Sequence, residues 1–399
     1  MSFERPYEGI KIVDMSQGIA GPYCAMLLAQ HGAEVIKVEP HQGDWSRMLG
    51  TPTNDHTEFS FVANMGKRSL AIDLKSRDAP KIIDALVEKA DVLLEGFRPG
   101  VIDRLGFGHE RLMKLNSGLI YVSISGFGQT GSLRDKPAMD PVLQAFSGFM
   151  LDNAGQDGTP HRANTVINDM STALYAFQAV APLLYAKRDG APGRYFDISL
   201  MRGAACLQAI RIMAASRGEL SLVARTAPSG IFRCADGWIQ LVIMQDRDFD
   251  ALCDILGLED LKSDRSLRGN EARLARADEL SERVSEILLT EPAAHWRELF
   301  TDAGLQNEIL QTYQQFLEHP QVIETELFSP VGLPGLAKPL PIPNPPGIPK
   351  ILCGTPTGIS PVTGQHSDEI LAGLGYKEIE IADLRNRGVV TTWTGQVGS

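Results

Sequence analysis

The segment GIKIVDMSQGIAGPYCAMLLAQHGAEVIKVE, residues 9–39, decides the fold of this chain. Its β-branched run GIKIV predicts a strand, and the turn-rich SQGIAG predicts a loop. Pro22 suits the first position of a helix that runs to Gln30, and Gly32 closes that helix. A second apolar run then ends at Glu39. Strand, helix and strand in this order form a βαβ unit, which predicts a parallel sheet.

The same alternation of strands and helices continues through the first half of the chain. Further strands are expected at 90–94, 119–125 and 194–200. Helical stretches at 78–89 and 110–115 alternate with them. Over residues 1–217 the pattern therefore predicts a large α/β domain with a Rossmann-like doubly wound sheet.

A change of pattern after Arg217 predicts a second, smaller domain. The dipeptide Asp236-Gly237 separates two alternating runs, 230–234 and 238–243, which is a strong hairpin signal. Helices are expected at 248–256, 270–289 and 293–303. Residues 218–327 are therefore expected to form a compact α+β domain.

The last part of the chain, residues 328–399, begins with a strap and ends in helices. The segment 328–349 is dense in proline and glycine, which predicts an extended, weakly structured strap. Helical patterns follow at 368–374 and 378–387. Such an arrangement is expected to return the C-terminus to the large domain, although it fits a reach across to another subunit equally well.

Bulk composition narrows the classes of function. The 399 residues are 43% hydrophobic and 22% charged, which is ordinary for a soluble globular protein. A formal net charge of -11 argues against a nucleic-acid or anionic-membrane surface but permits a local basic pocket. The five cysteines form no CxxC pair, so neither a disulfide framework nor a zinc site is expected. Because no apolar leader or bilayer-spanning run is visible, we expect a cytoplasmic protein.

The opening βαβ unit invites a dinucleotide-binding interpretation, with Glu39 on a ribose. The loop at 16–22 has two glycines but lacks the GxGxxG spacing, and Ile19 and Ala20 would crowd a pyrophosphate. An NAD-dependent oxidoreductase is therefore only a remote alternative. The chain also lacks a GxxxxGK[ST] loop, a GxSxG elbow and an HExxH pair, and no metal is expected.

Asp169 is the most informative single residue. It stands just ahead of Ser171, Thr172 and a long apolar segment, residues 173–185. This spacing favours a helix N-cap, in which the carboxylate accepts free backbone N–H groups and is kept ionised by them. An ionised carboxylate can also attack a carbonyl carbon as a covalent nucleophile. On spacing alone the cap is favoured, because caps are common and aspartyl nucleophiles are rare.

Seven separated motifs, in order along the chain, match one family. They are residues 13–39, 64–75, 95–106, 123–128, Asp169, 193–200 and 364–371. Through them the chain, from about Gly9 to the tail, resembles the class III coenzyme A transferases. This is the formyl-CoA transferase and carnitine CoA-transferase family, which also includes the α-methylacyl-CoA racemases. Each motif is weak by itself, but the ordered set is specific.

The resemblance implies transfer of CoA from an acyl-CoA thioester to a free carboxylic acid, with no tightly bound cofactor. In the family, an aspartate at the position of Asp169 attacks the thioester and forms a mixed anhydride, and then an aspartyl-CoA thioester. The loop Ser16–Gly18, with Gln17 at its centre, is the expected source of N–H donors for the developing oxyanions. Arg247 hints at an acyl group that carries a second carboxylate.

CoA carries phosphates, an adenine ring and an apolar arm, so cations, an aromatic side chain and open backbone are expected around it. The positions matched to CoA-binding residues of the family are Gln17, Gly18, Lys37, Ile72, Asp73, Leu74, Lys75, Gly96, Phe97, Arg98, Arg104 and Lys136. The matches of Lys37 and Lys136 to family positions depend on the local alignment. Taken alone, each cation is more commonly a solvated surface charge.

Three departures from the family pattern change the expected site. Glu95-Gly96-Phe97 replaces the usual Glu-Asn-Phe, so a side-chain amide contact to adenine is lost. The sequence VIMQDR at 242–247 replaces the glycine-rich loop of the best-known transferases, so a different lid is expected. Asp140 is expected either to orient Asp169 or an acceptor, or to cap the next helix.

The racemase branch of the family is the main alternative. It pairs the aspartate with a histidine base, because moving an α-proton needs a base on each face. That histidine corresponds to Met139, which cannot accept a proton, and His161 lies outside the motif. A transferase is therefore favoured. The family fold is an interlocked homodimer, with which the strap and the returning tail are compatible.

Overall fold

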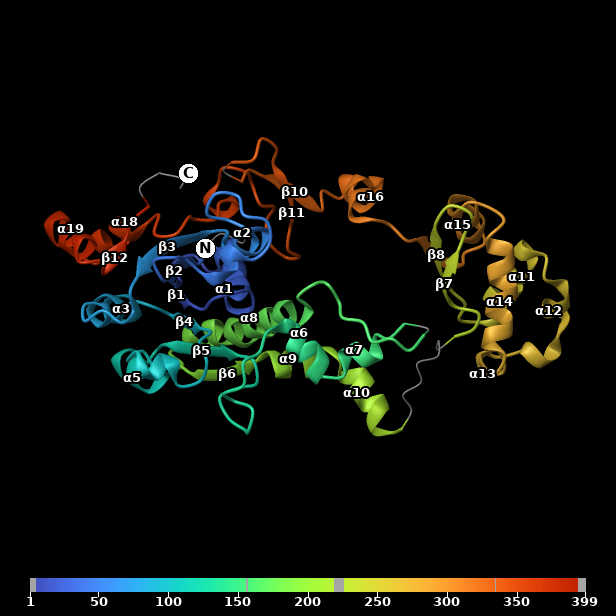
Figure 1. Cartoon of the computed structure of the whole chain (residues 1–399), viewed down its shortest axis with the longest axis horizontal. Helices are drawn as coiled ribbons and strands as arrows, with labels where there is room; N and C mark the ends of the chain where they lie inside the picture. The colour runs from blue at the N-terminus through green and yellow to red at the C-terminus, as the bar shows by residue number, and fades with distance from the viewer. Residues whose placement is uncertain (1–4, 156, 219–225, 334, 394–399) are drawn as a thin grey trace. The chain divides into compact units, whose positions relative to one another are not determined.

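The chain divides into two compact units (Figure 1). A computed structural model describes residues 5–155, 157–218, 226–333 and 335–393. The large unit comprises Met1–Met213 and Glu326–Ser399, and the small unit comprises Ala214–Thr325. The C-terminal segment therefore belongs to the same unit as the first half of the chain. Within the described ranges, no helix is both long and apolar enough to cross a membrane.

A seven-stranded sheet in the order β12-β3-β2-β1-β4-β5-β6 forms the centre of the large unit. Its strands are β1 Lys11–Met15, β2 Glu34–Glu39, β3 Lys67–Ile72, β4 Val92–Glu95, β5 Ile120–Ser125, β6 Tyr195–Ser199 and β12 Val390–Thr391. All neighbours pair in parallel except β12, which is antiparallel to β3. The predicted parallel α/β sheet is confirmed.

Helices cover both faces of this sheet, because successive strand side chains point to opposite sides. Ile12 packs in a cluster with α1 (Ala20–Gln30) and α8 (Ile167–Lys187). Its neighbour Val13 packs in the opposite cluster with α3 (Ala79–Val87). Burial on both faces explains why the strands read as continuous apolar runs rather than alternating ones.

The large unit has further elements, several of which pack on the same clusters. They are α2 Glu58–Asn64, α4 Val101–Arg104, α5 His109–Leu115, α6 Asp140–Phe146, α7 Phe149–Asp152, α9 Leu200–Leu207, α10 Ala209–Ser216, α18 Ser367–Gly373, α19 Glu378–Asn386 and the 3-10 turns η1 Trp45–Met48 and η3 Pro356–Gly358. Helix α10 runs past the unit boundary at Met213. The proline-rich strap contains regular structure, since β10 (Phe328–Val331) pairs antiparallel with β11 (Leu340–Pro343). The tail joins the large unit through α18, α19 and β12.

The small unit is built on an antiparallel sheet of three strands in the order β7-β8-β9. These are β7 Gly230–Arg233, β8 Trp238–Val242 and β9 Gln306–Ile309, and the predicted hairpin around Asp236-Gly237 is confirmed. Its helices are α11 Asp246–Leu256, α12 Glu259–Ser263, α13 Asn270–Leu274, α14 Ala277–Leu288, α15 Ala293–Asp302, α16 Tyr313–Glu318, α17 Pro320–Glu324 and the 3-10 turn η2 Arg265–Leu267. The single helix expected at 270–289 is wrong, because the chain leaves the helical conformation at Arg276.

Candidate active site

The loops at the carboxyl ends of the parallel strands enclose two cavities in the large unit. The first, of about 450 Å³, lies mainly against the loops after β2 and β3. The second, of about 410 Å³, lies mainly against the segments after β1, β4 and β5. Gln17, Trp45 and Phe97 line both cavities. Because Gln17 follows β1 and Phe97 follows β4, the shared wall lies where the strand connections diverge, the usual ligand site of an open α/β sheet.

The first cavity collects half of the positions expected to bind CoA. These are Gln17, Ile72, Asp73, Leu74, Lys75 and Phe97. Lys75 is exposed at the rim, and its backbone N–H donates to Oδ1 of Asp73 at 2.9 Å, which tightens the turn after β3. His41, Gln42 and Trp45 of the loop after β2 also line this cavity, although they were not predicted. The rest of the lining is Val38, Glu39, Pro40, Gly43, Met48 and Leu105. Apolar and aromatic walls with a cation at the rim are suited to an anionic ligand with a flat ring.

The second cavity brings Asp169 together with four other predicted positions, Gln17, Gly96, Phe97 and Arg98. Met139 also lines it, at the position where a racemase would carry its histidine. Among the described residues that line this cavity, Asp169 is the one carboxyl group, and no histidine is present. His161 is exposed and lines neither cavity. The arrangement thus offers a single carboxylate and no second proton base.

Asp140, not Asp169, caps α8. Oδ2 of Asp140 accepts the backbone N–H groups of Asn168 at 2.6 Å and Asp169 at 3.2 Å. Asp169 is the third residue of the helix, so its side chain projects outward from the first turn instead of closing it. The N-cap expected at Asp169 is wrong for this reason. Asp140 does not cap the next helix, α6, of which it is the first residue. Its buried carboxylate fixes the backbone of Asp169, which agrees with the other role considered for it.

The carboxyl group of Asp169 is desolvated and lacks donors. Burial raises its pKa to about 7, and the nearby negative charge of Asp140 adds to the increase. Within the described part of the chain, the Asp169 side chain accepts no hydrogen bond. The expectation that amide donors keep it ionised is therefore wrong. A carboxylate without such donors is a better nucleophile once it has lost its proton.

In the turn formed by residues 16–18 after β1, the backbone N–H group of Gln17 is free in the part of the chain that the structure describes. Ser16 donates its N–H to Oδ1 of Asp14 at 3.1 Å, and Gly18 donates its N–H to Oδ1 of Asp44 at 2.9 Å. The N–H of Gln17, between them, has no partner among the described residues. The role expected for Gly18 in binding CoA is not supported, because Gly18 is buried and lines neither cavity.

Gly96 keeps the Gln17 backbone accessible. A Cβ at Gly96 would lie 3.5 Å from the backbone nitrogen of Gln17, so a longer side chain there would extend across the turn after β1. Where the family usually has asparagine, this chain leaves that space open. With glycine at position 96, the side-chain amide contact to adenine is lost, and the backbone N–H of Gln17 stays uncovered beside the second cavity.

Lys37 is a buried structural residue and does not face either cavity. Its ammonium group is fully buried and donates to Oδ2 of Asp44 at 2.7 Å and to the carbonyl oxygen of Ser16. Oδ2 of Asp14 lies 3.8 Å away and also pairs with Lys67 at 2.7 Å. The buried position of Lys37 therefore does not support the prediction that it binds CoA.

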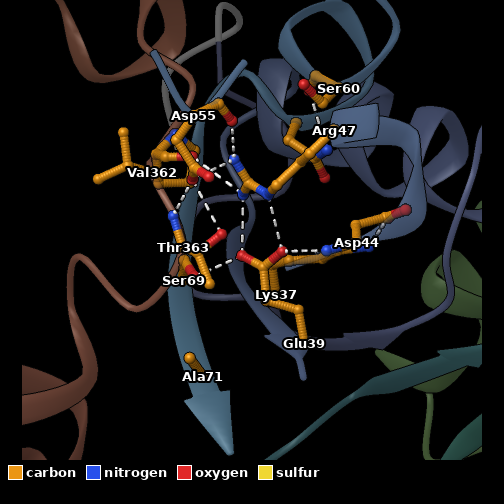
Figure 2. Close-up of polar contacts among 12 residues, drawn as sticks. Lys37, Glu39, Asp44, Arg47, Asp55, Ser60, Ser69, Ala71, Val362 and Thr363 are labelled. Carbon is orange, nitrogen blue, oxygen red and sulfur yellow. Dashed lines mark hydrogen bonds and ion pairs between the residues drawn. The ribbon is translucent and has the colours of Figure 1, made fainter. Parts of the chain in front are cut away.

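Glu39 and Arg47 extend this buried polar network toward the tail (Figure 2). The guanidinium group of Arg47 donates to both oxygens of Glu39 at 2.9 and 3.0 Å, and to Asp55 at 2.9 Å. The hydroxyl group of Ser69 donates to Oε1 of Glu39 at 2.6 Å, and Thr363 of the tail donates to Asp55. With both oxygens engaged, Glu39 cannot accept a ribose hydroxyl in the way a dinucleotide-binding site requires.

Two further predicted cations lie outside the cavities. Arg104 ends the short helix α4, and its exposed side chain lines neither cavity. Lys136 is exposed and lies over the ring of Phe127 at 5.6 Å from its centroid. The structure thus places Lys75 and Arg98 at the cavities but not Arg104 or Lys136. In the described ranges, no three histidine, cysteine or acidic side chains are arranged as metal ligands.

Comparison with known sequences identifies the family. The profile of CoA-transferase family III matches residues 7–367. An acetyl-CoA:oxalate CoA-transferase of Acetobacter aceti is 35% identical over 308 residues, covering 75% of this chain and 79% of the relative. The human succinyl-CoA:glutarate CoA-transferase is 30% identical over 395 residues, covering 97% of this chain and 90% of the relative.

Solved structures agree with this assignment. Rv3272 from Mycobacterium tuberculosis superposes with a TM-score of 0.81 at 28% identity, covering 92% of this chain and 99% of that one. A CaiB/BaiF family protein from Brucella suis gives a TM-score of 0.81 at 26% identity, with coverages of 93% and 100%. The match extends over both units of the chain. This protein belongs to CoA-transferase family III.

Proposed function

We propose that this enzyme transfers CoA from an acyl-CoA thioester to a free carboxylic acid, with Asp169 as the nucleophile. The observation that carries the proposal is the Asp169 carboxyl group itself, which lies without a hydrogen-bond partner among the described residues in a cavity that shares Gln17 and Phe97 with a second one. The names of the relatives, acetyl-CoA:oxalate and succinyl-CoA:glutarate CoA-transferase, support a small carboxylic acid as acceptor.

The reaction exchanges one acyl group for another in four steps. The Asp169 carboxylate attacks the thioester carbonyl and expels CoA thiolate, which leaves a mixed anhydride on Asp169. The thiolate attacks the Asp169 carbonyl and releases the first acid as its carboxylate. The acceptor carboxylate attacks the resulting aspartyl-CoA thioester and expels CoA thiolate, which leaves a second mixed anhydride on Asp169. The thiolate then attacks the acceptor acyl carbonyl of this anhydride, which forms the new acyl-CoA and releases the Asp169 carboxylate. No ATP is needed, because each high-energy bond is exchanged for a similar one.

Gln17 is the proposed oxyanion donor. Each attack places negative charge on a carbonyl oxygen, and a fixed N–H donor next to that oxygen lowers the barrier. The backbone N–H of Gln17 has no partner in the described part of the chain, and Gln17 lines the same cavity as Asp169. The Gly18 N–H, already donated to Asp44, is not proposed for this role.

CoA is proposed to span both cavities. The strand order β3-β2-β1-β4-β5-β6 supports a doubly wound, Rossmann-like sheet, and ligands of such sheets bind at the point of divergence. The adenosine end would lie in the first cavity against Phe97 and the Ile72–Lys75 turn, with Lys75 near a phosphate. Arg98, at the second cavity, supplies a further cation for the anionic ligand.

The pH dependence of the rate tests the role of Asp169. Only its ionised form attacks, and its raised pKa of about 7 leaves much of it protonated in mildly acidic solution. We expect kcat/KM for acyl-CoA to increase with pH and to level off above about 7. The acceptor acid does not cause this change, because a carboxylic acid of ordinary pKa near 4 is ionised throughout this range. A profile that is flat, or that falls, between about pH 5 and 8 would contradict the proposal.

A second copy of the chain is the proposed partner, in an interlocked homodimer. Helix α10 carries Ile210 and Met213 with 74% and 67% of their surfaces exposed, and Leu151 of α7 is 66% exposed. Large apolar side chains exposed together favour a protein interface. We expect light scattering at catalytic concentrations to give twice the 43.5 kDa mass of the chain. A fully active monomer would contradict this.

A further inference from the structure

Trp45 stands at the junction of the two cavities. It is the first residue of η1, directly after the loop that follows β2, and its side chain is half-buried. Among the residues that the structure describes, three line both cavities, namely Gln17, Phe97 and Trp45. Trp45 is the largest of these three side chains. A ligand that spans the two cavities would therefore lie near Gln17, Trp45 and Phe97.

The indole ring packs directly on the backbone of Gly18. A Cβ at Gly18 would lie 2.2 Å from Cζ2 of Trp45, which is closer than two non-bonded carbon atoms can approach. Gly18 also has a φ of +83°, a conformation that favours glycine. The absence of a side chain at Gly18 therefore allows the ring to lie against the turn after β1, next to Gln17.

One buried carboxylate fixes both sides of this contact. Oδ1 of Asp44 accepts the backbone N–H groups of Gly18 and Ser46, each at 2.9 Å. Oδ2 of Asp44 accepts from the ammonium group of Lys37 at 2.7 Å. The turn after β1 and the turn that carries Trp45 are thus held to the same group, which is inaccessible to solvent. The backbone on both sides of the contact is thus held in place by the fold itself.

We infer that Trp45 is a specificity-determining residue that contacts the pantetheine arm of an acyl-CoA. The inference rests on the proposed function, in which the thioester meets Asp169 in the second cavity and the nucleotide end lies in the first. The arm that joins these ends crosses the junction, and its gem-dimethyl and methylene groups match the flat apolar face of an indole ring. Trp45 then favours complete CoA thioesters over short thioesters that lack the arm.

The test compares a complete substrate with a truncated one. For Trp45→Ala, we expect kcat/KM for acyl-CoA to fall about tenfold or more, because removal of a central tryptophan contact commonly has an effect of this size. With the N-acetylcysteamine thioester of the same acyl group, which lacks most of the arm, we expect less than about a threefold change. Equal losses with both thioesters would overturn the inference.

Binding provides a readout independent of activity. We expect free CoA to change the indole fluorescence of the wild-type enzyme, and we expect this change to disappear in Trp45→Phe, which keeps an aromatic ring if Trp45→Ala fails to fold. The matched control is Trp238→Phe on β8, which should retain the signal. If calorimetry shows CoA binding equally to the wild type and both Trp45 variants, Trp45 does not contact the arm. If CoA does not bind the wild type at all, the proposed function itself fails.

Discussion

Replacement of Asp169 by asparagine is expected to abolish CoA transfer and to leave CoA binding intact. An amide cannot attack a thioester, and no other carboxyl group lines the second cavity among the described residues. We expect the exchange rate to fall on the order of 10³-fold or more, since loss of a covalent nucleophile is among the largest single-residue effects in catalysis. Isotope exchange between an acid and its CoA thioester measures the rate, and calorimetry measures the Kd of CoA.

The same substitution should stabilise the protein above neutral pH. The pKa of Asp169 is raised by folding to about 7, so the folded state binds more protons than the unfolded state between the ordinary aspartate pKa and that value. Stability of the wild type therefore falls as pH rises through this window and stays lower above it. The asparagine amide does not ionise, so Asp169→Asn should gain on the order of 2 kcal/mol at pH 8 and lose the advantage near pH 4.

The matched control is Asp189→Asn, an exposed aspartate just beyond the C-terminal end of α8. It should change neither the exchange rate nor the pH dependence of the free energy of unfolding. An Asp169→Asn enzyme that is fully active would contradict the nucleophile assignment. An inactive but less stable variant at pH 8 would contradict the desolvation argument.

Replacement of Lys37 by methionine is expected to destabilise the fold by about 3–5 kcal/mol, because removing one partner leaves a buried carboxylate unpaired. The carboxylate is Asp44, whose Oδ2 lies 2.7 Å from the Lys37 ammonium group. The turns after β1 and β2 both depend on Asp44, so unfolding of the large unit should shift to lower urea concentration. Urea titration followed by circular dichroism measures this shift.

Lys75→Met is the control that separates the two kinds of lysine. Lys75 is exposed at the first cavity, so its loss should change the urea midpoint little while the KM for acyl-CoA rises severalfold. The Lys37→Met variant should show a lower urea midpoint and little change in the KM for acyl-CoA, measured at temperatures where it remains folded. If Lys37→Met weakened CoA binding without destabilising the protein, the buried network would not have the structural role assigned to it.

Local sequence patterns were sufficient to predict the parallel sheet and the hairpin, but β3, β9 and β12 were not among the expected strands. The βαβ unit at 9–39 predicted the parallel sheet, because strand propensity, a proline in the first helical turn and a closing glycine are all local signals. The Asp236-Gly237 hairpin was equally local. The break at Arg276 was not predictable, since the helical periodicity continues across it and tertiary contacts decide where α13 ends.

Site residues were predictable where their role depends on the loop in which they lie. They were not predictable where a partner far away in the sequence determines their burial and hydrogen bonds. Lys37 and Lys75 look alike as cations near strand ends, yet Lys37 meets Asp44 and is buried, whereas Lys75 faces solvent. The cap on α8 comes from Asp140, which is 28 residues away from Asn168. In the sequence, Trp45 is only an aromatic residue in a polar loop, which is a weak indication of a site residue. Its contact with Gly18 depends on the fold.

Trapping of the covalent intermediate with hydroxylamine tests the central claim most directly. Hydroxylamine attacks the activated Asp169 carbonyl in either the anhydride or the thioester, which leaves a hydroxamate on the protein. Peptide mass spectrometry after incubation with acyl-CoA should locate that modification at Asp169, and only when acyl-CoA is present. A complete peptide map with an unmodified Asp169, obtained while product still accumulates, would contradict covalent catalysis by this residue.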